Sequence, residues 1–155
     1  MSHPILYRAA LARVLSQEER RLVESCLARS EQVDALARTL PDMILENRRR
    51  REGPQVTFTK SQLRTIRSFE RDSRKAAAEL PQILAAIPSV HLLLVTAIEG
   101  ERTALRMDMA VHAGGHPEDE ALARPLLELR AANIADLEAF GSGRAQQEVT
   151  PGGDP

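Results

Sequence analysis

The sequence predicts an all-α protein, a compact bundle of about five or six helices, because apolar residues recur at steps of three and four along most of the chain. Its 155 residues are enough for one domain with a real core, and 43% hydrophobic with 28% charged residues is typical of a folded globular chain. Only 3% of the residues are aromatic, so Leu, Ala, Ile, Val and Met must fill the core. That composition favours helices.

The first third of the chain predicts two helices. A short amphipathic helix spans residues 4–15, and Ser16-Gln17-Glu18-Glu19 has the pattern of a capping box that starts the next helix. Pro41 either kinks this second helix or restarts it, and Gly53-Pro54 ends whatever helix reaches that far. The apolar line of the second helix consists of Leu22, Cys26, Val33, Leu36 and Leu40. Such a line needs a partner helix.

The middle of the chain predicts an extended connector over residues 55–58, followed by a third helix. Thr59-Lys60-Ser61-Gln62 is a second capping-box pattern, and the helix runs from Lys60 to Leu80. Pro81 kinks or restarts it, and Pro88-Ser89 marks the next break.

Residues 90–112 are open to two interpretations. As a helix, the segment places Leu94, Val95, Ile98, Leu105 and Met109 on one face, with Glu99, Glu101, Arg106 and Asp108 off that face. As a β-hairpin it would alternate apolar and polar residues around a turn near Glu99-Gly100. We favour the helix because the surrounding segments are helical.

The last predicted helix follows a break at Gly114-Gly115, and His116 caps its start. Gly141 is its expected end, and the Gly-, Pro-, Gln- and Ser-containing residues 141–155 are expected to be a disordered tail. The chain is therefore expected to form a single helical domain over residues 1–140, with an internal break near 53–58. The apolar line of the last helix consists of Leu122, Leu126, Leu129, Ile134, Leu137 and Phe140.

Charge is distributed very unevenly along the chain. Residues 47–75 contain ten basic and three acidic side chains, a net charge of +7, so the rest of a chain whose total is −1 carries −8. Within the third predicted helix, steps of 4, 3, 4 and 3 residues place five cations in one narrow arc that extends about 21 Å. We call this row the basic ridge; it consists of Lys60, Arg64, Arg67, Arg71 and Arg74.

The basic ridge is opposite an apolar set made of Ile66, Phe69, Ala76, Leu80 and Ile83, so packing of the helix would point the cations outward. Arginine side chains fit phosphate oxygens, and the preceding cluster Arg48, Arg49, Arg50 and Arg51 could extend the surface. The leading hypothesis is a non-catalytic helical subunit that contacts a nucleic-acid phosphate backbone. The pI near 6.4 argues against a free-standing nucleic-acid binder, and the few aromatic residues argue against base stacking. Base-specific reading is therefore not expected, and we expect sequence-tolerant backbone contact as one subunit of a larger nucleoprotein assembly.

Two alternatives remain open. The basic ridge could be merely solvated, or paired with the protein's own acidic residues. The protein could also be a protein–protein adaptor or a self-associating regulator without nucleic-acid binding, because the apolar line from Leu22 to Leu40 and the charge polarity suit contacts between copies.

Other functional classes are disfavoured. We expect no enzyme, since the chain has no phosphate-binding glycine loop, nucleophile elbow or paired-cysteine motif, and we expect no cofactor. No metal site is expected either, because two glycines break any helix between His112 and His116. The lone Cys26 is interpreted as core packing. The longest apolar stretch, residues 92–98, is too short for a membrane span, and the amino terminus has no secretory pattern, so a cytoplasmic location is expected.

Overall fold

A computed structural model of the chain describes residues 4–87, 89–112 and 115–149, and leaves out the side chains of residues 69, 73, 76 and 143–149. No strand occurs in this described part, which confirms the all-α prediction, and residues 90–112 are one continuous helix instead of a hairpin. Its five helices are α1 (Pro4–Leu11), α2 (Gln17–Glu52), α3 (Lys60–Ala85), α4 (Val90–His112) and α5 (Pro117–Val149).

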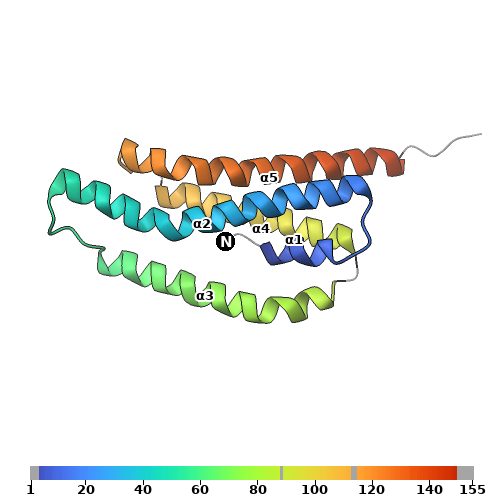
Figure 1. The fold of residues 1–155 in the computed structure, drawn as a ribbon, viewed down its shortest axis with the longest axis horizontal. Helices are drawn as coiled ribbons and strands as arrows, with labels where there is room; N and C mark the ends of the chain where they lie inside the picture. Colours follow the sequence, from blue (N-terminus) through green and yellow to red (C-terminus); the bar gives the residue numbers. More distant parts are fainter. Residues whose placement is uncertain (1–3, 88, 113–114, 150–155) are drawn as a thin grey trace, which may run out of the picture.

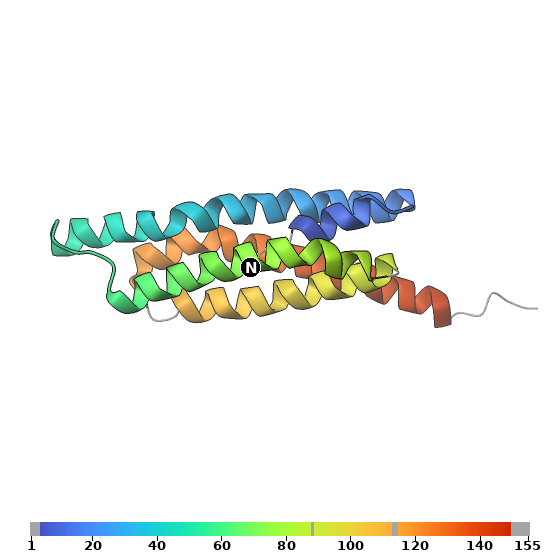
Figure 2. The same ribbon diagram turned by 90° about the horizontal axis from the view of Figure 1, so that it is seen from below.

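The four long helices run alternately up and down, and the short α1 lies among them (Figures 1 and 2). Helix α5 packs against α2 and α4, and α1 packs against α2, α4 and α3. The substantial packing of α3 is therefore with α1, so α3 forms an outer layer of the bundle (Figure 1).

Helix starts follow the predicted capping boxes. The Ser16 hydroxyl accepts from the Glu19 N–H at 3.1 Å, and the Glu19 carboxylate accepts from the Ser16 N–H at 3.1 Å. Thr59 and Gln62 make the same reciprocal pair at the start of α3, with distances of 3.1 and 2.9 Å. These bonds satisfy N–H groups that have no partner within the helix.

Helix ends are less well predicted. Gly53 does end α2, with a φ of 116° that favours glycine and an N–H that donates to the Arg49 carbonyl at 2.9 Å. Pro41 and Pro81 interrupt neither α2 nor α3. Helix α1 stops at Leu11, four residues earlier than expected.

The expected stop at Gly141 is wrong, since α5 continues through it to Val149. One glycine inside a helix costs only about 1 kcal/mol relative to alanine, and the following residues are compatible with a helix. The expected disorder of residues 141–149 is therefore replaced by helix, and residues 150–155 lie outside the described part of the chain.

Two apolar clusters form the core. The first joins α1, α2, α4 and α5 with Leu84 of α3, and includes Val23, Leu93 and Leu137. The second, built around Val33 and Leu126, belongs to α2 and α5. A layer of buried polar residues lies between the two clusters and consists of Ser30, Glu101, Arg130 and Asn133.

The predicted apolar face of α4 is wrong in part. Val95 and Met109 are exposed, while Glu101 is buried and Asp108 is half-buried. The buried line of α4 consists of Leu94, Ala97, Glu101, Ala104 and Asp108, at steps of three and four. Carboxylates can occupy this line because Arg130 of α5 pairs with both of them.

Candidate nucleic-acid interface

All five residues of the basic ridge are exposed on α3. The opposite side of the helix carries Leu80, which packs against the first apolar cluster, and Leu84, which is buried in it. Ile66 is half-buried, whereas Ile83 is more than half exposed. Phe69 and Ala76, also expected on that side, have side chains outside the described set. The amphipathic pattern thus turns the cations toward solvent, as the sequence predicts.

The basic ridge makes few contacts of its own. Arg71 lies 3.9 Å from Asp72, its neighbour in sequence, and the Arg74 Nε donates to the Glu70 carbonyl at 3.5 Å. Within the described part of the chain, Lys60, Arg64 and Arg67 have no side-chain hydrogen bond or ion pair. No ion pair joins the ridge to an acidic residue of another described helix.

Three of the four arginines at positions 48–51 make hydrogen bonds or ion pairs within the protein. The Arg49 Nε donates to the Val56 carbonyl at 2.9 Å, and Arg48 lies 3.7 Å from Glu52. Arg51 pairs with Glu118 at 3.1 Å and with Asp119 at 3.0 Å, which attaches the end of α2 to the start of α5.

Arg50 is the exposed member of the cluster, and its side chain makes no hydrogen bond or ion pair with the described residues. It lies at the end of α2, where a loop leads directly into α3 (Figure 1). Arg50 is therefore the residue of this cluster whose guanidinium is available to extend the basic ridge.

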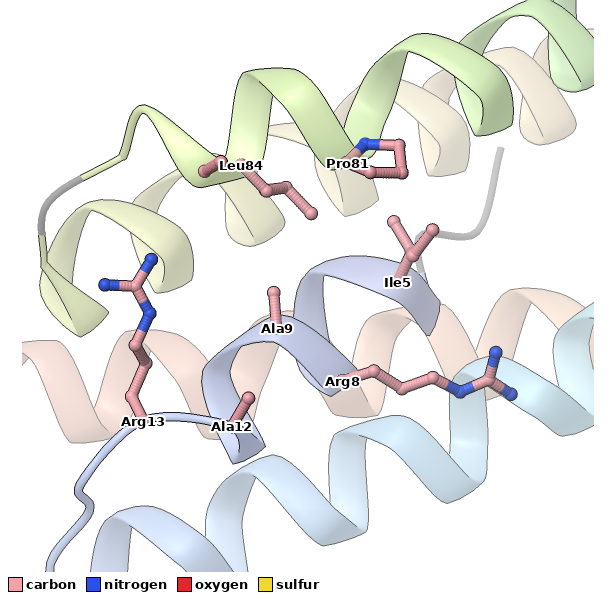
Figure 3. Close-up of a pocket in the computed structure, with 8 residues that line it drawn as sticks. Ile5, Arg8, Ala9, Ala12, Arg13, Pro81 and Leu84 are labelled. Atoms are coloured by element: carbon pink, nitrogen blue, oxygen red, sulfur yellow. The ribbon is translucent and has the colours of Figure 1, made fainter.

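Helix α3 is held to the bundle near its C-terminal end. The Arg13 Nη2 donates to the Ile87 carbonyl at 3.0 Å, just beyond the last turn of α3. Figure 3 shows Ile5, Ala9 and Ala12 of the α1 segment facing Pro81 and Leu84 of α3 across an open hollow of about 390 Å³. Small side chains leave this contact incompletely filled. The cations lie N-terminal to it, away from the attachment.

A buried polar network spans the interior of the bundle. The Tyr7 hydroxyl donates to the Glu101 Oε1 at 2.9 Å, and the Asn133 Nδ2 donates to the same oxygen at 3.2 Å. Arg130 lies 3.4 Å from the Glu101 Oε2, and its Nε donates to Asp108 at 2.7 Å. Side chains of Glu101 and Arg130 are only 1% and 2% exposed. The network links α1, α4 and α5, and its charges are paired, which is typical of a structural role.

Sequence reasoning missed this network. The signal was present, since Leu126, Arg130, Asn133 and Leu137 follow steps of 4, 3 and 4 on one face of α5. The prediction considered only the apolar residues of α5 and so left Arg130 and Asn133 out of its buried face. A buried charge is recognisable only once its partner on another helix is known.

The remaining candidate residues have local roles. His116 accepts a hydrogen bond at Nδ1 from the Glu118 N–H at 3.2 Å, which confirms it as a cap of α5. Cys26 is fully buried, and burial raises the pKa of its thiol to about 12. A thiol with so high a pKa is not a nucleophile at neutral pH. No group of three His, Cys, Asp or Glu side chains that could hold a metal gathers within residues 4–87, 89–112 and 115–149.

Comparisons with protein-family models, with curated proteins and with solved structures gave no match to this chain. None of the described helices is long and apolar enough to cross a membrane.

Proposed function

We propose that this protein is a non-catalytic helical subunit that contacts the phosphate backbone of a nucleic acid through the basic ridge, with Arg50 in support, as part of a larger nucleoprotein assembly. One observation carries the proposal: five exposed cations share one face of α3, and no ion pair joins them to an acidic side chain of another described helix. A row about 21 Å long can meet several phosphates at once. Contact with phosphates alone carries no sequence information, so binding is sequence-tolerant.

Charge reversal tests the proposal directly. The double variant Arg64→Glu and Arg71→Glu is compared with Arg21→Glu and Arg124→Glu, which make the same change at exposed residues on α2 and α5. Neither Arg21 nor Arg124 makes a side-chain hydrogen bond or ion pair with the described residues. Fluorescence anisotropy measures the binding of labelled DNA and RNA at about 50 and 200 mM salt.

We expect the ridge variant to lose at least about tenfold in affinity for every sequence and to show a weaker salt dependence, since fewer counterions are released. The control variant should bind nearly as the natural chain does. Equal losses in both variants, or unchanged binding in the ridge variant, would contradict the proposal.

A protein–protein adaptor or self-associating regulator is the second candidate, and one observation favours it. Met107 and Val111, four residues apart and therefore on one face near the end of α4, have exposed fractions of 52% and 69%. Large exposed apolar side chains close together are typical of interaction surfaces.

Sedimentation velocity separates the two candidates. Self-association through this end of α4 predicts a dimer or larger species that Met107→Ser combined with Val111→Ser converts to monomer. A monomer at both low and high salt contradicts the self-associating form.

A further inference from the structure

The five cations of the basic ridge lie within an arc of about 80° on α3, and the exposed Lys75 lies about 60° from the centre of that arc. Helix α3 is uninterrupted from Lys60 to Arg74, and its only proline lies C-terminal to this segment. At 100° per residue, the exposed Glu70 and Asp72 lie about 80° and 120° to either side of the centre of the row. A planar anionic surface such as a lipid bilayer would bring these carboxylates toward its own negative charge. A linear polyanion can follow the row without meeting them.

Among the side chains that the structure describes, no aromatic residue lies on the ridge. Tyr7 is fully buried in the polar network, and Phe140 is half-buried against the first apolar cluster. Phe58 is half-buried in the loop before α3, and the backbone places Phe69 opposite the ridge, about 180° from Lys60. Proteins that hold single strands combine a basic groove with exposed aromatic side chains, which compensate for ordering a flexible chain.

A duplex suits this surface better than a single strand. It carries one charge per about 1.7 Å of axis, against about 3.4 Å for one strand, and its phosphates are already held in place. Resting on the proposed function, we infer that the basic ridge lies along a phosphate strand of double-helical nucleic acid and prefers a duplex to a single strand. The preference comes from the straight, rigid row of cations, together with the burial or half-burial of every aromatic side chain that the structure describes.

Counterion release sets the size of the expected preference. With five phosphate contacts, the slope of log affinity against log salt is roughly −4.5 for a duplex and roughly −3.5 for a single strand. If the two affinities are equal at about 1 M salt, this difference in slope favours the duplex by about tenfold at about 100 mM salt. The affinity difference should narrow as salt is raised.

The test uses the full chain and three probes at equal phosphate concentration: a labelled mixed-sequence duplex of about 24 base pairs, one of its strands alone, and vesicles of phosphatidylserine and phosphatidylcholine. The matched variants are Arg64→Gln with Arg71→Gln on the ridge and Arg21→Gln with Arg124→Gln elsewhere. Circular dichroism verifies that both fold. We expect duplex binding about tenfold tighter than strand binding, and loss of that preference in the ridge variant alone.

Each other outcome is decisive. Strand binding as tight as duplex binding overturns this inference and leaves the proposed function standing. Vesicle binding tighter than duplex binding, or no binding of either nucleic acid at low salt, overturns the proposed function together with the inference.

Discussion

Tyr7 of α1 donates its hydroxyl to the buried carboxylate of Glu101 on α4, which is 94 positions away in sequence. Helix α1 has only eight residues, too few to be stable alone in water. Because α3 packs mainly on α1, this hydrogen bond also supports the layer that presents the basic ridge.

Tyr7→Phe should lower the free energy of unfolding by about 1.5–3 kcal/mol, because it removes a buried hydrogen bond to a charged group and retains the ring. Urea denaturation followed by circular dichroism measures the change. Val14→Ala, at a residue that is 99% exposed, is the control and should change stability by less than about 0.5 kcal/mol. A Tyr7→Phe chain as stable as the natural one would show that the hydrogen bond does not hold α1.

Arg130→Met should be more damaging, at about 3–5 kcal/mol, because it leaves Glu101 and Asp108 without their cation. Adding Glu101→Leu to Arg130→Met should recover part of the loss, since it removes a buried charge that has become unpaired. A double-mutant cycle in urea measures the coupling. Strictly additive losses would contradict pairing between these two side chains.

Stability should fall in alkali in a way that depends on Cys26. Burial raises the pKa of its thiol from 9.0 to about 12, so the unfolded chain releases the proton first. The stabilisation that the protonated Cys26 thiol gives the folded state is therefore complete below about pH 9 and is lost as the pH rises toward 12. Cys26→Ala should flatten the decline in unfolding free energy between about pH 9 and pH 12, measured in urea. An identical decline in the natural chain and the Cys26→Ala variant would show that other titratable groups cause the loss of stability in alkali.

Replacement of Gly141 and of Gly53 by alanine should change the stability of the protein in opposite directions. At Gly141 an added Cβ meets nothing within 4 Å inside a helix, so Gly141→Ala should raise stability or helix content, by about 0.5–1 kcal/mol if the whole helix unfolds cooperatively. At Gly53 the φ of 116° lies in a region that residues with a Cβ rarely adopt, so Gly53→Ala should be destabilising. Thermal melts of the two variants measure both effects. A destabilising Gly141→Ala would argue against helix at that position.

Substitutions of the neighbouring residues Arg50 and Arg51 should have different effects, one on nucleic-acid binding and the other on stability. Arg50→Gln should weaken nucleic-acid binding and leave the melting temperature unchanged, because Arg50 is exposed and its side chain makes no hydrogen bond or ion pair with the described residues. Arg51→Gln should lower the melting temperature, since it removes the ion pair with Asp119. Anisotropy and thermal melts on both variants form the test. A loss of stability in the Arg50 variant, with a loss of nucleic-acid binding in the Arg51 variant, would contradict these two roles.

Local signals predicted most of the helices well. Capping boxes at Ser16 and Thr59 and the positive φ of Gly53 operate within a few residues, so their patterns are visible in sequence. Prolines were harder to interpret, because the loss of one hydrogen bond at Pro41 or Pro81 can be offset by packing along the rest of a long helix.

The sequence by itself determined the helical class, the cap positions and the row of cations on α3, since each depends on helical periodicity and the chemistry of neighbouring residues. Only the tertiary structure decided that Glu101 and Arg130 are buried, that Arg51 is paired while Arg50 is free, and that α3 rests on α1. The physical reason is that burial of a charge is tolerated only where a partner arrives from a distant segment, and local periodicity does not contain that partner.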